Sequence, residues 1–369
     1  MSNTIGLYIH IPFCKSKCPY CDFFSGRASE NDYDNYIKIL SDNISLWSTK
    51  TDKAVSSVYF GGGTPSILGA ERLSLLLNKI KEEFSVADNA EITVEVNPDS
   101  GKTLDFDLLK LTGFNRISVG MQSAVEQELK ALGRIHSIND AEVTVKKAQK
   151  AGIAGIKNIS LDLMLGIPYQ TIDSLKKSID FCASCGVTHI SSYILKIESG
   201  TVFEKIQDKL ELPDEDRQTQ LYLFAVDYLK KLGFEQYEIS NFSKVGYESR
   251  HNINYWKCGE YIGIGPSAHS FFDGKRFYYS RNMEDFTHNK TFFDCYGGDK
   301  EEFIMLSLRL KSGLNFKEYR ERYNEDFPKD KIKNIKKFAD MGYMVLTDDC
   351  AYFTPKGYLV SNTIISELI

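Results

Sequence analysis

The chain has 369 residues, and its 42% apolar and 26% charged side chains are typical of a globular protein with a large domain and a smaller appendage. Its net charge of −5 provides no general attraction for nucleic acid, and no apolar run reaches the roughly 18 residues of a membrane span. Eight cysteines, with no signal-peptide pattern at the first residues, predict a cytoplasmic protein whose thiols bind metal rather than form disulfides.

Strand and helix patterns alternate through the first two-thirds of the chain. An apolar run at 5–13 predicts the first strand, and apolar side chains spaced by three and four residues from Tyr33 to Trp47 predict the first helix. Five further strands are expected at 55–60, 91–96, 116–119, 156–165 and 187–195. The later helices are expected at 71–84, 104–111, 123–149 with a break near Gly133, 171–185 and 214–232. Six strand–helix units predict an α/β fold, a partial (β/α)6 barrel of parallel strands that stays open.

The loop after the first strand contains Cys14, Cys18 and Cys21, with the spacing C-x3-C-x2-C. Three thiols so close together can converge on one metal centre, but they are one fewer than the four ligands of a closed tetrahedral site. In a four-iron cluster they would hold three irons and leave the fourth free for a small ligand. A zinc site completed by His10 or by a distant cysteine is the alternative, as is a loop of unrelated thiols, but the spacing differs from the C-x2-C pairs of zinc ribbons.

This spacing, with Tyr20 directly before the last cysteine, resembles the signature of the radical S-adenosylmethionine (SAM) enzymes. The resemblance implies a [4Fe-4S] cluster whose open iron binds the amino and carboxylate groups of SAM. In that family an electron from the cluster cleaves a carbon–sulfur bond of SAM and gives a deoxyadenosyl radical. The family also has a partial barrel of the kind that the strand–helix alternation predicts.

Glycine and polar residues follow the predicted strands at their carboxyl ends, where barrels of parallel strands bind their ligands. The glycines at 61–63 would let backbone groups approach SAM closely, although such turns are common after strands. Glu95 would accept hydrogen bonds from ribose hydroxyls, or it is a surface carboxylate. Asp162 lies in an apolar strand, where an unpaired carboxylate is costly. Gln122 and Arg134 offer the donors and acceptors that a nucleoside and a carboxylate need, or they are caps and ion pairs.

Six runs of the chain form a specific combination. They are HIPFC at 10–14, GGGTPS at 61–66, EVNP at 95–98, RISVGMQ at 116–122, LGRIH at 132–136 and DLMLGIP at 162–168. Together they resemble the oxygen-independent coproporphyrinogen III oxidase group and, within it, the haem chaperones of the HemW family. By this resemblance Cys14, Cys18 and Cys21 hold the cluster. The residues that it assigns to SAM are Tyr8, Gly62, Gly63, Thr64, Glu95, Gln122, Arg134 and Asp162.

Two features distinguish the chaperones from the oxidase. The oxidase has a fourth cysteine two residues after the last cluster ligand, where this chain has Phe23, and an extension before its first strand that is absent here. Both argue against coproporphyrinogen dehydrogenase activity. The run at 251–256 matches the H-N-x-x-Y-W motif of the chaperones, and haem iron commonly takes an imidazole ligand. His251 is therefore the expected haem contact, with Tyr255 or Cys258 as alternative iron ligands. The structural alternative is a histidine that caps a turn beside core aromatic residues.

Two classes of function follow. In the first, the protein is a haem chaperone that binds haem and transfers it to an acceptor protein, while the cluster and SAM serve structure, assembly or regulation. In the second, it is a radical enzyme that oxidises a propionate-bearing porphyrinogen. The expected partners are haem, a haem-acceptor protein whose identity the sequence does not reveal, and an electron-donor protein; nucleic acid is not expected.

The pattern changes towards the end of the chain. We expect the barrel at 1–235, a connecting segment at 236–299 and a C-terminal domain at 300–369. In that domain, helices at 301–310, 316–323 and 331–341 precede short strands at 343–346 and 351–357, which resembles a winged-helix module. The acidic turn at 348–349 argues against DNA binding and favours a lid or docking domain.

Two further features are expected to be structural. Cys182 and Cys185 lie on the apolar side of a helix, which favours core packing over a redox pair. The glycine-rich run at 261–270 resembles the family's Y-x-G-x-G-x-x-A-H segment. It is expected to shape the far wall of the pocket without a specific contact.

Overall fold

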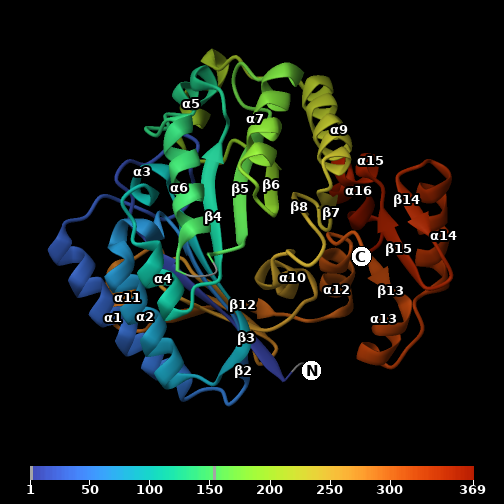
Figure 1. Ribbon diagram of the computed structural model, residues 1–369. Coiled ribbons are helices and arrows are strands. Elements are labelled where there is room, and N and C mark those ends of the chain that lie inside the picture. The colour runs from blue at the N-terminus through green and yellow to red at the C-terminus, as the bar shows by residue number, and fades with distance from the viewer. Residues whose placement is uncertain (1–2, 153–154) are drawn as a thin grey trace.

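The computed structural model describes residues 3–152 and 155–369. The prediction that the chain begins without a signal peptide concerns Met1 and Ser2 among others, and these two lie outside the described residues. Its main feature is a twelve-stranded sheet in which six parallel strands follow one another in chain order (Figure 1). These strands are β1 (Thr4–Ile11), β2 (Ala54–Gly62), β3 (Val86–Val96), β4 (Arg116–Gln122), β5 (Asn158–Leu165) and β6 (His189–Ile194). Helices connect each strand to the next, which confirms the predicted α/β fold.

Helices pack against the outer face of these strands and enclose the main core (Figure 1). The longer ones are α1 (Glu30–Ser48), α2 (Gly69–Glu83), α4 (Phe106–Thr112), α5 (Glu126–Ala131), α6 (Ile138–Lys150), α7 (Ile172–Ser184) and α9 (Glu215–Lys231). Short turns of helix lie between them: η1 (Pro65–Leu68), α3 (Pro98–Gly101), α8 (Val202–Lys205) and η2 (Gln207–Lys209). The predicted break separates α5 from α6, where Gly133 has a φ of +65° that favours glycine. Ser29, Ser137 and Thr171 begin α1, α6 and α7 with capping boxes.

The segment that was expected to connect two domains adds strands to both edges of the barrel sheet. On the β6 side it contributes β8 (Asn241–Ser243), which is antiparallel to β6, and β7 (Glu235–Gln236), which is antiparallel to β8. On the β1 side it contributes β9 (Tyr261–Ile264), which is parallel to β1, and then the antiparallel strands β10 (His269–Phe272), β11 (Lys275–Tyr279) and β12 (Thr291–Tyr296). Helices α10 (Arg250–Trp256) and α11 (Met283–Thr287) lie between these strands in the chain.

The C-terminal part is a smaller unit of helices and an antiparallel sheet with the order β13-β15-β14. Its elements are α12 (Lys300–Ser307), β13 (Leu314–Asn315), α13 (Phe316–Tyr323), α14 (Lys329–Asp340), β14 (Met344–Leu346), β15 (Cys350–Phe353), α15 (Pro355–Leu359) and α16 (Ser361–Ser366). It packs on the barrel through α15 and α9, and through α12 and α10. In the described part of the chain, no helix has the length and apolar character needed to cross a membrane.

The two faces of the barrel strands differ in chemistry. On β1, Ile5, Leu7, Ile9 and Ile11 face the helices and are fully buried, whereas Tyr8 alternates with them on the inner face. The inner positions of the other strands are also largely polar. Because the parallel strands end at one edge of the sheet, their last inner side chains gather at one rim.

Candidate cofactor site

The cysteine loop leaves the carboxyl end of β1 and returns to it. The backbone N–H of Cys14 donates to the carbonyl of Gly26 (2.9 Å), and that of Gly26 donates to the carbonyl of Pro12 (3.0 Å). These bonds close the loop at its base. Cys14, Cys18 and Cys21 are free thiols on the wall of one cleft at the rim of the barrel.

The cleft encloses about 780 Å³ of space, part of it open to solvent. The residues that the sequence predicted for the cluster and SAM line it, with the exception of Tyr8. Those residues are Cys14, Cys18, Cys21, Gly62, Gly63, Thr64, Glu95, Gln122, Arg134 and Asp162. They come from the cysteine loop, the ends of β2 to β5 and the segment after α5. Residues that are far apart in the sequence, such as Cys14 and Asp162, therefore meet at the carboxyl ends of the parallel strands, where the sequence analysis expected the ligands.

The glycine turn after β2 packs against the base of the cysteine loop. The backbone N–H of Gly63 donates to the carbonyl of Ile11 (2.8 Å), and that of Thr64 donates to the carbonyl of Phe13 (2.8 Å). A Cβ atom on Gly62, whose φ is +109°, would lie 2.5 Å from the His10 ring, and one on Gly63 would lie 2.6 Å from the Phe13 carbonyl. The sequence predicted that these glycines make room for a ligand. In the structure, they first make room for the neighbouring strand and loop.

Two carboxyl groups lie at the floor of the cleft. Glu95 accepts hydrogen bonds from the Tyr59 hydroxyl (2.8 Å) and from the backbone N–H of Gly62 (3.3 Å). Asp162 accepts from the hydroxyls of Ser118 (3.0 Å) and Ser160 (3.0 Å). Burial raises the pKa of Glu95 to about 7, and burial also raises the pKa of Asp162. Both groups are positioned to accept hydrogen bonds from a ligand.

Arg134 and Gln122 supply donors at the upper wall. Arg134 donates to the Asn97 side chain (2.9 Å) and to the Gly120 carbonyl (2.6 Å), and its Nη1 lies 3.5 Å from the sulfur of Cys18. Its buried Nε has no partner among the described residues. Gln122 ends β4 with a φ of +71°, a strained conformation that often marks functional positions, and accepts from the Tyr193 hydroxyl (2.8 Å).

His10 is not available to complete a metal site. Its Nδ1 is hydrogen-bonded to the Tyr8 hydroxyl (3.1 Å) and its Nε2 to the Phe24 carbonyl (3.0 Å). Within residues 3–152 and 155–369, no group of three or more His, Cys, Asp or Glu side chains is arranged to hold a single metal ion. A four-iron cluster takes each thiolate on a different iron, and the three thiols that line this one cleft supply that donor set.

Tyr8 and His251 lie below the cleft rather than in its wall. The rings of Tyr8 and His251 both stack on the ring of Tyr59. Their centroids lie 6.2 Å and 5.1 Å, respectively, from the centroid of Tyr59. His251 is 1% exposed, its Nδ1 is hydrogen-bonded to the Ser57 hydroxyl (2.8 Å) and its Nε2 to the Tyr255 hydroxyl (2.7 Å). Burial lowers the pKa of His251 to about 3. Its imidazole is thus neutral and fully engaged.

Sequence reasoning gave no role to several residues that line the cleft. Tyr193, at the end of β6, binds Gln122, and Asn97 binds Arg134. Ser118 holds Asp162. The strand-end rule would have found Tyr193, because it is the last inner residue of β6, as Glu95 is the last inner residue of β3. The roles of Asn97 and Ser118 depend on contacts across strands that spacing does not reveal.

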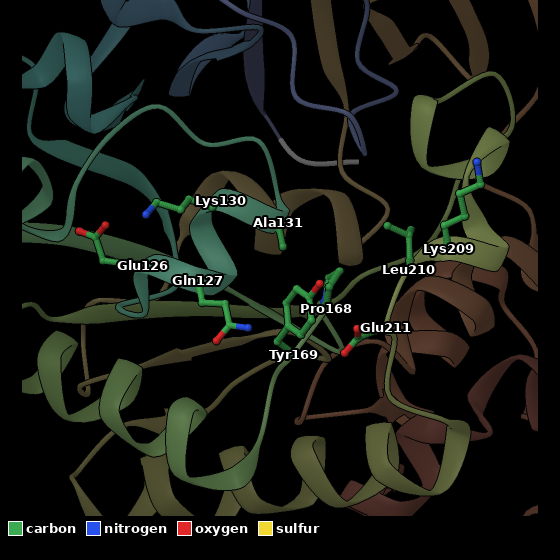
Figure 2. Close-up of a pocket in the computed structure, with 9 residues that line it drawn as sticks. All are labelled: Glu126, Gln127, Lys130, Ala131, Pro168, Tyr169, Lys209, Leu210 and Glu211. Carbon is green, nitrogen blue, oxygen red and sulfur yellow. The ribbon is translucent and has the colours of Figure 1, made fainter.

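A larger cavity of about 1080 Å³ lies elsewhere, between α5 and the segments around residues 168 and 210. Figure 2 shows Pro168 and Tyr169 between Gln127 of α5 and Glu211, and the backbone N–H of Tyr169 donates to the Glu211 carbonyl (3.1 Å). Its wall contains none of the three loop cysteines. This cavity is a surface depression outside the site described above.

Comparisons with known proteins agree with this geometry. The family described as "Radical SAM superfamily" matches residues 8–182, and the "HemN C-terminal domain" matches residues 300–360. The chain is 34% identical to the heme chaperone HemW of Buchnera aphidicola subsp. Acyrthosiphon pisum, over 98% of this chain and 97% of that protein. It is 32% identical to HemW of Bacillus subtilis, over 98% of each. Among solved structures, coproporphyrinogen III oxidase (HemN) from Escherichia coli matches with a TM-score of 0.83 and 20% identity, over 98% of this chain and 89% of that one, which shows a shared fold.

Proposed function

The chain belongs to the HemW family within the radical SAM superfamily, and we therefore propose that it is a haem chaperone, which binds haem and transfers it to an acceptor protein. In this proposal it also carries a [4Fe-4S] cluster and SAM. The observation that supports the cofactors most strongly is one cleft in which three free thiols face two carboxyl groups and an arginine.

Cys14, Cys18 and Cys21 hold the cluster in this proposal. When bound, the cluster supplies an electron and one open iron site for SAM. The donor set fits, because three thiols line the same wall and Arg134 lies 3.5 Å from the sulfur of Cys18, where its charge offsets that of a thiolate. The hydroxyl of Thr64 lies 3.4 Å from the sulfur of Cys14 and fixes that side chain as well.

The remaining residues of the cleft bind SAM. Glu95 and Asp162 are acceptors for ribose hydroxyls or the ammonium group, and the hydroxyls that already bind them fix their orientation. Arg134 and Gln122 are donors for the carboxylate and the nucleoside. The backbone of Gly62 and Gly63, with Thr64, forms the wall on the β2 side. Tyr8 acts indirectly, since its hydroxyl binds His10 beneath the glycine turn.

The resemblance assigns the haem contact to His251, and this stays a prediction. Coordination of iron there requires the imidazole to release Ser57 or Tyr255 and to leave a site in which it is 1% exposed. The alternative ligands are also engaged. The Tyr255 hydroxyl is bonded to His251, and the buried sulfur of Cys258 lies 3.7 Å from a carboxylate oxygen of Glu302.

Phe23 weighs against the oxidase as the function. It stands where the oxidase has a fourth cysteine, lines the cleft and is 64% exposed. A phenyl ring offers no ligand, nucleophile or proton at that position. The large exposed apolar side chain is better suited to contact with an apolar cargo than to a catalytic step.

The partners follow from the proposed cycle. Haem is the cargo, an acceptor protein receives it, and an electron-donor protein reduces the cluster. We propose a cytoplasmic location, because cysteines that hold a metal centre stay reduced there.

One experiment separates the two functions. The cluster is reconstituted anaerobically, SAM and a reductant are added, and haem and coproporphyrinogen III are offered in parallel. The chaperone predicts stoichiometric retention of haem, its transfer to an added apo-haemoprotein, and no consumption of coproporphyrinogen III. Turnover of coproporphyrinogen III without haem retention would overturn the proposal and support the oxidase.

A further inference from the structure

We propose that His269 coordinates haem iron on the inner face of the sheet formed by β9 to β12, beside the cysteine loop. The inference rests on the proposed haem-chaperone function and names the surface that carries the cargo. That surface, which we term the aromatic ladder, consists of His269, Tyr278 and Phe292. His269 belongs to the glycine-rich run at 261–270, to which the sequence assigned no specific contact, and Tyr278 and Phe292 belong to no motif.

The aromatic ladder is built by cross-strand pairing. His269 of β10 is paired with Tyr278 of β11, and Tyr278 is paired with Phe292 of β12. Their rings stack, with centroids 5.2 Å apart at 25° and 5.8 Å apart at 23°. All three side chains are at least partly exposed. Stacked rings in a row turn their edges away from the sheet, so the ladder presents a row of apolar ring edges on which the face of a porphyrin can rest.

The aromatic ladder lies on the same face of the sheet as the inner wall of the barrel. Residues that are paired across strands, or that lie two apart on one strand, share a face. Tyr8 of β1 is paired with Gly263 of β9, and Tyr261 is paired with Phe271 of β10. Gly263 and Tyr261 lie two apart on β9, and Phe271 and His269 lie two apart on β10. Tyr8 and His269 therefore share a face of the sheet. The ladder therefore continues the inner wall on which the cleft is built.

A contact between side chains places this surface beside the cysteine loop. Arg281, which follows β11, donates two hydrogen bonds to the carboxylate of Asp22 (3.1 and 2.8 Å). Asp22 directly follows Cys21, and the charge of Arg281 also acts on His269. Exposed Phe23 is the next residue of the loop. Haem on the aromatic ladder thus lies next to the cleft rather than in it.

His269 is an exposed histidine on the aromatic ladder whose ring is free to bind iron. His10, His136, His189 and His251 are buried and hydrogen-bonded. His288 is exposed too, and its Nδ1 binds the Glu284 carbonyl (2.8 Å) while its Nε2 has no hydrogen-bond partner in the described part of the chain, but it lies at the end of α11 rather than on the aromatic ladder. Among the described residues, the exposed imidazole of His269 has no hydrogen-bond or ion-pair partner. Burial by its neighbours lowers the pKa of His269, which keeps the ring in the neutral form that binds a metal.

Charges around the aromatic ladder suit the two propionates of haem. Lys290 lies over the Phe292 ring, with its Nζ 4.8 Å from the centroid, and Arg281 lies on the side of the loop. Both side chains are exposed and can turn from their present partners, Asp285 and Asp22, towards a propionate. Asp294 and Arg276 are the other charged groups that act on His269. Because β12 is the edge of the sheet, haem enters and leaves from the side without unfolding of the barrel.

The test is a titration of the full-length protein with haemin, followed by the absorbance of the Soret band. The wild type is compared with His269→Ala and with His288→Ala, the matched control at the other exposed histidine. Coordination by nitrogen of the imidazole donates a lone pair to iron and changes no oxidation state. We expect His269→Ala to bind haem about tenfold more weakly or worse, a change of ~1.4 kcal/mol. Its spectrum should lose the imidazole-ligated form and regain it when free imidazole is added, whereas His288→Ala should match the wild type.

A second variant tests the platform. Tyr278→Ala should weaken haem binding but retain the spectrum of an imidazole ligand. Identical affinity and spectrum in the wild type and His269→Ala would overturn the inference. If His251→Ala lost the haem instead, the proposed function would stand and the ligand would be His251. If the wild type retained no haem, the proposed function itself would fail. Circular dichroism of each variant checks that the fold is intact.

Discussion

The hydroxyl of Tyr59 donates a 2.8 Å hydrogen bond to Glu95 at the floor of the cleft. The ring of His251 stacks on that of Tyr59, with the centroids 5.1 Å apart. Tyr59 therefore connects the H-N-x-x-Y-W motif to the proposed SAM site. The motif supports the cleft even though it does not line it.

The first prediction concerns this connection. Tyr59→Phe removes one of the two donors to Glu95, so we expect SAM to bind about threefold to tenfold more weakly, equivalent to ~0.5–1.5 kcal/mol for one hydrogen bond. Calorimetry on the reconstituted protein measures this. Tyr228→Phe is the matched control, because its hydroxyl binds Asp180 on the outer helices (2.6 Å) and it should leave SAM affinity unchanged. Equal affinities for both variants would contradict the role of Tyr59.

The second prediction concerns pH. The pKa of Glu95 is about 7 because of burial, and only the carboxylate accepts hydrogen bonds from two donors and a ligand. We expect SAM affinity to fall as the pH is lowered through about 7, and Glu95→Gln to reduce this dependence. An unchanged pH profile in Glu95→Gln would count against Glu95 as a SAM contact.

The same pKa predicts the opposite trend for stability without SAM. The folded pKa of Glu95 lies above its ordinary value of 4.5, so the folded state binds more protons between these two values. Its contribution to the free energy of unfolding therefore increases as the pH falls from about 7 towards 4.5. Urea titrations at several pH values give the free energy of unfolding of the wild type and of Glu95→Gln. The difference between the two proteins measures the contribution of Glu95. A difference that is constant with pH would show that the pKa of Glu95 is not raised.

The third prediction concerns the glycine turn. Gly62→Ala places a Cβ 2.5 Å from the His10 ring, whereas a Cβ on Gly69, whose φ of +79° is also positive, meets nothing within 4 Å. Both substitutions cost about 1–3 kcal/mol for the backbone conformation, since Gly69 (φ +79°, ψ 162°) lies in a region that only glycine adopts readily. Only Gly62→Ala should cost a further ~1–3 kcal/mol from overpacking. Denaturant unfolding of the two variants measures the difference, and equal losses would show that the contact with His10 is easily relieved.

The fourth prediction concerns His251. His251→Ala leaves the buried hydroxyls of Ser57 and Tyr255 without their partner and creates a cavity, so we expect a loss of ~2–4 kcal/mol of stability. His288→Ala should change stability by less than ~0.5 kcal/mol because the side chain is exposed. Thermal unfolding measures both. A fully stable His251→Ala would mean that the imidazole is less important to packing than its burial indicates.

The sequence predicted the barrel and most of the cleft because both depend on local signals. Apolar periodicity located β1 to β6, and the rule for strand ends located Glu95 and Asp162. Of the strands that were missed on the two sides of the barrel, β7 has two residues and β9 has four, which is too short for a period to be visible. The sequence left open whether His251 is a haem contact or a histidine packed beside aromatic residues, because its burial depends on Ser57, which is 194 residues away in the chain. The motif at 261–270 contains His269, but its aromatic surroundings could not be predicted, because Tyr278 and Phe292 join it only through pairing across strands.

The central claim is that three cysteines hold a cluster with an iron open to SAM. The most direct measurement is electron paramagnetic resonance of the reduced protein after anaerobic reconstitution, with and without SAM, for the wild type and for serine variants of Cys14, Cys18 and Cys21. Cys295→Ser, at an exposed thiol outside the cleft, is the control. We predict a [4Fe-4S] signal that changes when SAM is added, that is lost in the three loop variants and that persists in Cys295→Ser. A wild-type protein without this signal, or with a signal that SAM does not alter, would contradict the account.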